Sequence, residues 1–452
     1  MRERIKTLVL LILVLTSIGL TGRLLFGQPA LETAALPAYE QLVFGEMRPV
    51  TEQNLPTLRL QEEEEKEEEE EEEQKETTWR ILFPWDNEHR QAWGLMLDLM
   101  RISELPQQQE EAPELTGRVV TAEFAVPASP GLWLSSAASA DLQITEAAWL
   151  AAEPEYIWYR DVAGEWLKGQ LPALPPEWES ETVETFSRGA VYVASEAESW
   201  QALNLPEEDV ILLPGEMPVL AAHATVPEEL DAEKLLRSIF VDTALVRRIE
   251  ERDGAFIYTD GQRGLRFFSR GEMEYSSPNS EPGQEPLELS QILRETAQYL
   301  QLMGGWPDHL HLKQLEEAPQ LSWDRRQQRT YSLSLFSVQN GVPLITPQPA
   351  VSLRLSDRGV IHYNRQITLL DSPVGQESPL LDPRDLAETV AERLEAEHGG
   401  ARLVDIYPAY FVDRAAGQST AHPVWTFSFS GNKKAVMHGH TGRFLTWIEE
   451  EQ

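Results

Sequence analysis

The segments LRFFSRGEMEY (residues 265–275) and LRLSDRGVIHY (residues 353–363) resemble each other closely. They match without gaps at Leu, Arg, Arg, Gly and Tyr. Each alternates around a central Gly in the way that a two-stranded antiparallel hairpin does. The match indicates that the chain contains one structural unit twice.

The similarity continues beyond the two hairpins. A Pro-containing linker leads in each case to an acidic stretch with helical spacing, LSQILRETAQYLQLMGG (289–305) and PRDLAETVAERLEAEHGG (383–400), which ends in a Gly-Gly pair suited to a helix C-terminus. A strand candidate follows, and then an alternating strand, TYSLSLF (330–336) or VWTFSF (424–429). Four ordered elements that agree in type favour two copies of a ββαββ-like unit over a chance likeness of short hairpins.

The length of 452 residues is typical of about three domains. Before the repeats, 89–105 has the apolar spacing of a helix, whereas 155–161 and 189–195 have the alternation of strands. We therefore predict an α+β protein: an N-terminal transmembrane helix, then a three-domain extracytoplasmic body whose last two domains are a duplicated antiparallel-sheet-plus-helix unit. The predicted ranges are 1–27 for the cytoplasmic tip and anchor, 28–225, 226–345 and 346–452.

The stretch RIKTLVLLILVLTSIGLTGRLLFG (4–27) predicts the anchor. Residues 7–27 reach about 31 Å as a helix, enough to span a bilayer core, with Arg23 snorkelling to the headgroups. A cleaved signal would have a small-residue site where Arg23 and further hydrophobic residues stand. Arg2, Arg4 and Lys6 precede the helix, so the positive-inside rule puts the N-terminus in the cytoplasm. We expect a single-pass protein of the cell membrane.

The outer half of this helix is rich in small residues, which let two membrane helices approach closely. Ordinary membrane-helix composition is the alternative, since no strict GxxxG is present. We predict a contact with a transmembrane partner helix through Thr16, Ser17, Gly19, Thr21 and Gly22.

Charge excludes some classes of partner. Lys and Arg number 38 against 74 Asp and Glu, and the net charge of −36 argues against nucleic acid. Part of the charge lies in QEEEEKEEEEEEEQKE (61–76), which has nothing apolar to bury and is predicted to be a disordered acidic insertion rather than a cation site.

The residues offer little for catalysis, a cofactor or a metal. The chain contains no Cys, no G-x-S-x-G, no HExxH and no phosphate-binding loop. His309 and His311, beside Asp308, and His438 and His440 are two possible metal-binding pairs, but a closed site needs more ligands. We interpret all four as surface histidines, and we expect no enzyme activity, no catalytic or metal-binding residue and no cofactor.

Several stretches in order resemble the YycH family of membrane-anchored regulators: 238–268, LMGGWPDHL (302–310) and GVIHYNRQ (359–366), together with the short charged N-terminus. The acidic insertion departs from the family pattern. The resemblance implies a regulator of two-component signalling in Gram-positive bacteria, whose partners are a sensor histidine kinase that controls cell-wall metabolism and a companion called YycI. It also implies that the central and C-terminal domains share a topology.

Two other functions stay open. The tail NKKAVMHGHTGRFLTW (432–447) has a loose likeness to a PepSY-type module, which would favour an anchored module that binds wall polymer or inhibits a protease. A hydrolase with an unrecognised site is the third possibility. Co-purification with membrane proteins, binding to wall material or a protease, and substrate turnover would distinguish the three.

Overall fold

The structure is a computed structural model, and it describes residues 42–65, 75–104, 109–133, 142–195, 197–206, 209–240, 242–268, 271–277, 285–321, 327–413 and 419–449. Strands dominate this part of the chain, and helices cover the sheets. The predicted α+β class is confirmed. The predicted membrane helix lies outside the described residues. Within those residues, no helix combines the length and the apolar character needed to cross a membrane.

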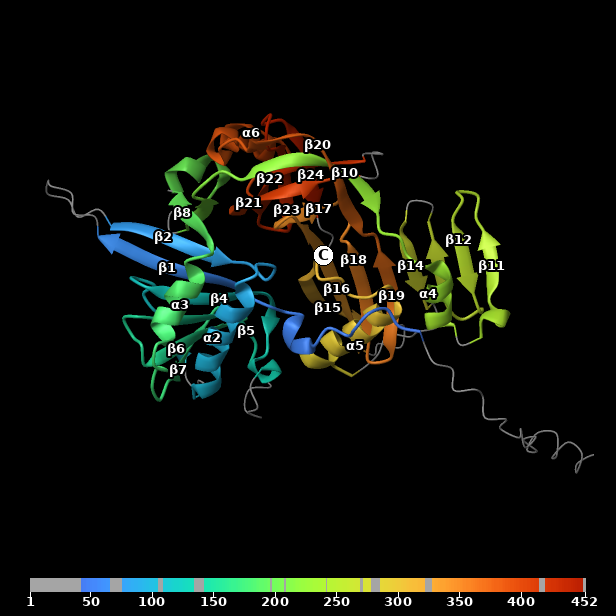
Figure 1. The fold of residues 1–452 in the computed structure, drawn as a ribbon, viewed down its shortest axis with the longest axis horizontal. Helices are drawn as coiled ribbons and strands as arrows, with labels where there is room; N and C mark the ends of the chain where they lie inside the picture. Colours follow the sequence, from blue (N-terminus) through green and yellow to red (C-terminus); the bar gives the residue numbers. More distant parts are fainter. Residues whose placement is uncertain are drawn as a thin grey trace, which may run out of the picture. The chain divides into compact units, whose positions relative to one another are not determined.

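The first sheet is antiparallel throughout (Figure 1). Its strands lie in the order β3 (Gln109–Glu110), β7 (Trp166–Gln170), β6 (Tyr156–Asp161), β5 (Ile144–Leu150), β4 (Val119–Ala128), β1 (Thr57–Glu65), β2 (Lys75–Leu82), β8 (Ala190–Ser195) and β9 (Ile211–Pro214). Helices α2 (His89–Ile102) and α3 (Trp178–Phe186) share one core with it. Trp93, Met96, Leu97 and Met100 of α2 are buried there, as the helical spacing predicts.

The second sheet contains the remaining described strands. Its main path is β11 (Arg247–Glu250), β12 (Phe256–Thr259), β13 (Gly264–Phe267), β14 (Met273–Ser276), β19 (Gly359–Arg365), β18 (Val351–Ser356), β16 (Gln327–Gln339), β17 (Val342–Ile345), β21 (Leu403–Phe411), β22 (Thr420–Phe429), β10 (Val219–Pro227) and β20 (Thr368–Pro379). Three strands lie off this path: β15 (Leu310–Leu321) pairs with β16, β23 (Lys433–His438) pairs with β22, and β24 (Phe444–Glu449) pairs with β23.

Helices cover two separate halves of this sheet. Helix α5 (Leu289–Leu302), with α4 (Ala232–Ile239), packs on the strands from β13 to β16, and α6 (Ala387–His398) packs on β21, β22 and β23. A parallel pair, β17 with β21, joins the two halves. Short 3-10 helices lie at Val50–Glu52 (η1), Pro130–Leu132 (η2), Ala197–Leu203 (η4), Thr243–Leu245 (η5) and Pro383–Leu386 (η6).

The elements predicted for the repeats are present. Both hairpins form, both helices follow, and each is succeeded by an antiparallel pair. The second hairpin, however, lies in the half of the sheet that α5 covers, because β19 pairs with β14 and β18 pairs with β16. Strand β10 crosses residue 225 and pairs with β20 and β22. The predicted divisions near 225 and 345 therefore do not separate sheets, and the duplication stays a prediction.

The two strands that flank the acidic run continue into it. Residues 61–65 belong to β1 and residues 75–76 to β2, and Gln61 through Glu65 pair with Trp79 through Lys75. Backbone hydrogen bonds extend a ladder whatever the side chains are, and Arg118 offsets part of the charge by an ion pair with Glu62 at 3.0 Å. The prediction of disorder was wrong for these residues, and 66–74 lie outside the described ones.

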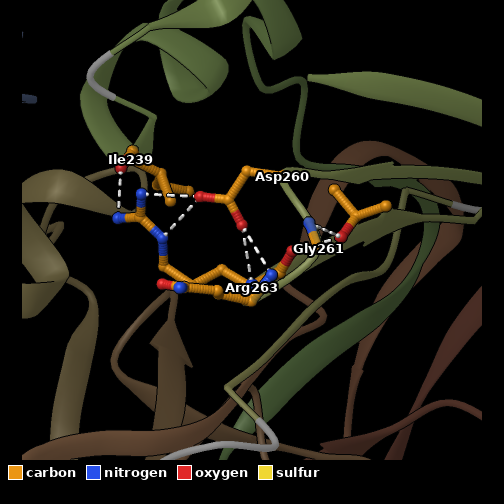
Figure 2. Close-up of polar contacts among 6 residues, drawn as sticks. Ile239, Asp260, Gly261 and Arg263 are labelled. Carbon is orange, nitrogen blue, oxygen red and sulfur yellow. Dashed lines mark hydrogen bonds and ion pairs between the residues drawn. The ribbon is translucent and has the colours of Figure 1, made fainter. Parts of the chain in front are cut away.

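The β12–β13 turn is held to the end of α4 by one arginine (Figure 2). The Arg263 guanidinium donates to both sides of this contact: Nε and Nη2 reach Asp260 Oδ2 at 3.1 and 2.8 Å, and Nη1 reaches the Ile239 carbonyl at 2.8 Å. Asp260 Oδ1 accepts the backbone N–H groups of Gln262 and Arg263. Partial burial would raise the pKa of the Asp260 carboxyl, but these hydrogen bonds lower it below its usual value.

A fully buried arginine closes the C-terminal end of α5. Arg365 on β19 is 0% exposed, and its Nε and Nη2 each donate to the Glu228 carboxylate at 2.7 Å. Nη1 also donates to the Gly305 carbonyl at 2.8 Å. Gly304 has a φ of +104°, and a Cβ there would lie 3.1 Å from the guanidinium carbon. The Gly-Gly pair thus ends the helix and lets the arginine approach its free carbonyls.

Candidate binding cleft

A cleft of about 1310 Å³ lies between the first sheet and the second. One wall consists of the segment before β1, the end of β2, α2, β4 and β8, and the other of β15, β16, β17, β21 and β23. The cleft is larger than the roughly 300–1,000 Å³ of most small-molecule pockets. Its size suits a segment of a polymer.

Trp85, just after β2, connects the two walls. Its Nε1 donates to the Gly341 carbonyl at 3.1 Å, and its ring lies edge-on to His311 and Phe336 at 5.3 and 6.0 Å. Phe83 stacks on the indole at 4.9 Å with the planes almost parallel. This aromatic cluster fixes one part of the cleft.

A second connection comes from the segment before β1 and reaches the residue next to His311. Arg48 Nη1 donates to the Leu310 carbonyl at 3.0 Å, and Nη2 pairs with Asp308 at 3.4 Å. Phe44 donates its backbone N–H to the Gln301 carbonyl at 2.7 Å, next to the end of α5. The segment before β1 is therefore attached to α5 and to the start of β15.

Two side-chain amides between these connections have an unpaired oxygen. Gln53 and Asn54 are 3% and 2% exposed. The amide nitrogens are engaged, since Gln53 Nε2 donates to the Arg48 carbonyl at 2.9 Å and Asn54 Nδ2 donates to the Val126 carbonyl at 2.8 Å. Within the described residues, Gln53 Oε1 and Asn54 Oδ1 have no hydrogen-bond partner. Both oxygens are themselves shielded from solvent, and such groups are uncommon in a folded interior.

The imidazoles of the cleft are neutral at neutral pH. Burial lowers the pKa of His89 to about 4, and its Nε2 donates to the Pro56 carbonyl at 2.7 Å. Burial, and to a smaller extent the charge of Arg48, also lowers the pKa of His311 to about 4. The Nε2 atom of His311 has no partner in the described part of the chain.

The remaining part of the cleft carries charges of both signs. Arg59 and Glu123 form an ion pair at 2.6 Å on the first wall. Asp405 opens to the cleft but is enclosed by protein on most sides, and this loss of water raises the pKa of its carboxyl above the usual value. The lining includes the basic residues Arg48, Arg59, Arg90, Arg101, Lys313 and Lys434 and the acidic residues Glu52, Asp86, Glu123, Asp308 and Asp405. The cleft is thus close to neutral in a chain of net charge −36.

The proposed membrane-helix contact residues, Thr16, Ser17, Gly19, Thr21 and Gly22, lie outside the described residues. That contact stays a prediction.

The four histidines singled out in the sequence are half-buried rather than on the surface, so that interpretation was wrong. His311 is packed against Trp85, as given above, and His309 lies next to it with an unpaired Nε2. His438 Nδ1 accepts the His440 N–H at 3.3 Å, and His440 Nε2 lies 3.2 Å from the Ser378 carbonyl. Within the described ranges, no three His, Asp or Glu residues are arranged to hold a metal ion.

Sequence reasoning did not find the cleft. Its walls come from segments as far apart as Gln53 and Val404, and neither side chain belongs to a local motif. The burial of Arg365 could have been predicted, because strand alternation puts it on the same face as Tyr363, which is buried.

Comparisons with known proteins identify a family from the sequence and a similar fold among the solved structures. A family model described as YycH protein, C-terminal domain, matches residues 208–441. The crystal structure of YycH from Bacillus subtilis superposes with a TM-score of 0.57 at 12% identity, over 86% of this chain and 97% of that one. At this identity the superposition supports the fold alone.

Two further solved structures are more distant. They are an uncharacterized protein from Eubacterium rectale (TM-score 0.37, 10% identity, 56% of this chain and 99% of that one) and the YpeB C-terminal domain of Bacillus megaterium (TM-score 0.30, 10% identity, 50% and 100%). Similarity at this level supports no inference about this chain. A comparison with curated proteins finds no match.

Proposed function

This chain belongs to the YycH family, and we propose that it is a membrane-anchored, extracytoplasmic regulator of a sensor histidine kinase that controls cell-wall metabolism. The match of the family model to 208–441, half of the chain, carries the proposal. YycH proteins are regulators in the YycG two-component system, so regulation by protein contact rather than catalysis follows from membership.

The proposal includes the cellular location of the protein. Residues 7–27 would hold the body outside the membrane with the N-terminus in the cytoplasm, because the apolar run is long enough to span and basic residues precede it. Mass spectrometry of the membrane fraction tests this. A mature chain that begins between Gly22 and Glu40 would contradict the anchor.

The partners we propose are the kinase and a YycI-like companion. The small residues from Thr16 to Gly22 would contact a transmembrane helix of one of them, since small side chains permit close helix packing in lipid. In a Gram-positive host, both proteins should co-purify with the full chain after mild detergent extraction.

A helix exchange tests recognition by the membrane segment. Residues 7–22 are replaced by an unrelated leucine-rich span of equal length, and kinase-dependent transcription is recorded after export is verified. We expect altered transcription in the exchange strain and a similar change in a deletion strain. Unchanged transcription in the exchange strain alone would leave recognition to the extracytoplasmic body, whereas no change even on deletion would contradict the regulator itself.

A further inference from the structure

We propose that β11, the strand at one end of the second sheet, pairs antiparallel with β11 of a second copy of this chain and so forms a two-fold dimer with one continuous sheet. Such a dimer goes beyond the proposed function, because it is an interface between copies of this chain and not a contact with the kinase or the companion.

Strand β11 has a free edge in the described part of the chain. It begins the strand order of the second sheet and, among the described strands, pairs with β12 alone (Figure 1). Its four residues are all exposed: Arg247, Arg248, Ile249 and Glu250. The apolar one, Ile249, is 49% exposed. The edge of a sheet carries backbone donors and acceptors with which a further strand can pair.

The hairpin geometry identifies which backbone groups of β11 point outward. Glu251 donates its N–H to the Ala255 carbonyl at 2.8 Å, so residue 251 bonds toward β12. Hydrogen-bonded and non-hydrogen-bonded pairs alternate along an antiparallel ladder, so every second residue before it also bonds inward. The N–H and C=O groups of the residues in between, Arg248 and Glu250, therefore point to the free edge.

These outward groups limit how two copies can pair. The registers that keep the strands overlapped place Arg248 opposite itself, Glu250 opposite itself, or Arg248 opposite Glu250 of the second copy. The first two put like charges directly opposite each other, which is destabilising. In the third register the Arg248–Glu250 pair occurs on both sides of the two-fold axis, and each pair exchanges two backbone hydrogen bonds.

The same register also matches the neighbouring side chains. It puts Ile249 opposite Ile249 of the second copy as a non-hydrogen-bonded pair, whose Cα atoms lie about 4.5 Å apart. Each isoleucine would then cover the other. Arg247 would lie opposite Glu251 of the second copy, a carboxylate that also pairs with Arg266 at 2.6 Å within its own chain. The contact thus buries an apolar centre between pairs of opposite charge.

The sequence of the strand favours a second copy over a different partner. A two-fold contact requires a surface that is complementary to itself. RRIEE (247–251) consists of two basic, one apolar and two acidic residues in that order, so reversal about Ile249 exchanges the signs of the charges. Charged side chains commonly protect a sheet edge by repelling another strand. Here a reversed copy of the strand meets opposite charges instead.

Disulfide trapping tests the register, because the chain contains no Cys of its own. The contact is short, so we expect a reversible dimer that oxidation captures. The full-length chain carrying Ile249→Cys is purified in mild detergent and oxidised, and dimers are measured on a non-reducing gel. Directly opposed residues at this spacing suit a disulfide. We expect most of this variant to be trapped.

Val374→Cys is the matched control. Val374 is 52% exposed and lies on β20, the strand at the other end of the main path of the sheet. Both proteins have the same N-terminal segment, so contacts made there do not distinguish them. We expect only a trace of trapped dimer for the control.

Charge reversal in the Ile249→Cys background tests the pairing itself. Arg248→Glu and Glu250→Arg each create two like-charge pairs in a homodimer, so each variant alone should be trapped roughly tenfold less. When the two variants are mixed, with tags of different mass, both pairs of the heterodimer again have opposite charges. The heterodimer should therefore be trapped as well as the parent. Thermal unfolding verifies that each variant is folded.

Equal trapping of Ile249→Cys and Val374→Cys would overturn the proposal. So would a mixture of the two charge variants that is trapped no better than either variant alone. The kinase-dependent transcription above is measured separately, so either proposal can fail without the other.

Discussion

Arg365 and the cleft residue Gln53 are both almost fully removed from solvent, but they differ in how many of their polar atoms have a hydrogen-bond partner. The Arg365 guanidinium donates hydrogen bonds to the Glu228 carboxylate and to the Gly305 carbonyl after α5. Around Gln53, one end of the amide is bonded and the other is not. A closed network holds elements together, whereas an open one leaves binding capacity unused. The comparison identifies Arg365 as part of a fully paired network, and Gln53 as a buried amide whose oxygen has no hydrogen-bond partner within the described residues.

The largest expected effect is at the closed network. Arg365→Met should lower the free energy of unfolding by about 3–5 kcal/mol, because it leaves the Glu228 carboxylate unpaired at a site with little water. Urea unfolding of the full-length protein, followed by tryptophan fluorescence, measures the loss. The double variant Arg365→Met with Glu228→Leu should recover part of it, since no charge then remains unpaired. A loss below about 1 kcal/mol in the single variant would contradict the structural role.

The second prediction concerns the cleft and acid. His89 has a pKa of about 4 in the folded chain against 6.5 for an ordinary imidazole, so the unfolded chain takes up the proton first as the pH falls. The stabilisation is complete above about pH 6.5 and is lost as the pH falls toward 4. Between pH 7 and 4.5 we expect a loss of about 2 kcal/mol from this group.

The control for the acid prediction is His89→Gln, whose amide can still donate toward the Pro56 carbonyl but does not titrate. Urea unfolding at the two pH values should show a smaller difference for this variant than for the wild type. His311, which also titrates near 4, accounts for acid sensitivity that persists. An identical difference in the two proteins would show that His89 is already protonated or accessible.

How far the sequence predicts this structure depends on the distance over which each feature acts. The alternation that puts Tyr331, Leu333 and Leu335 on one face is local, and all three are buried as expected. The Gly304–Gly305 end of α5 is likewise readable from the chain. The pairing of β19 with β14 cannot be predicted from local sequence, because Tyr275 and Tyr363 become neighbours only through the register of the sheet.

The cleft is the extreme case of this limit. Gln53 lies in the loop before β1, Trp85 in the loop after β2 and Val404 on β21, and no periodicity connects them. The histidine pairs mislead for the same reason: the sequence gives His311 the pattern of a surface residue in an alternating strand, and its contact with Trp85, in the loop after β2, appears only in the folded chain. Properties that arise from packing between distant segments are absent from local patterns.

The third prediction tests an arginine of intermediate exposure. Arg263 also donates Nε and Nη2 to a carboxylate, although both reach the same Asp260 oxygen. Its side chain is 34% exposed, so water compensates part of what is lost when the contact is removed. Arg263→Ala should lower the free energy of unfolding by about 1 kcal/mol, through the lost bonds to Asp260 and to the Ile239 carbonyl. Urea unfolding measures it. Arg263→Lys retains the charge but cannot bond both groups, so its free energy of unfolding should lie between those of the wild type and Arg263→Ala. A loss as large as that of Arg365→Met would show that pairing geometry, not burial, sets the scale.

The smallest expected effect is at an exposed pair of the same geometry. Arg384 donates Nε and Nη2 to the Asp382 carboxylate at 2.6–3.0 Å, yet its side chain is 53% exposed. Water solvates both groups when the pair is broken, so Arg384→Ala should change the free energy of unfolding by less than about 0.5 kcal/mol.

Asp382 supplies a matched comparison within the same turn. Its carboxylate also caps η6 by accepting the Arg384 backbone N–H at 2.9 Å, a bond that Arg384→Ala leaves in place. Asp382→Ala removes the cap as well as the ion pair and should cost about 1 kcal/mol. If urea unfolding shows a larger loss of stability for Asp382→Ala than for Arg384→Ala, the cap rather than the ion pair stabilises this turn. The large effect expected at Arg365 then derives from burial. If Arg384→Ala costs as much as Asp382→Ala, the exposed ion pair is itself stabilising, and burial alone does not explain the large effect expected at Arg365.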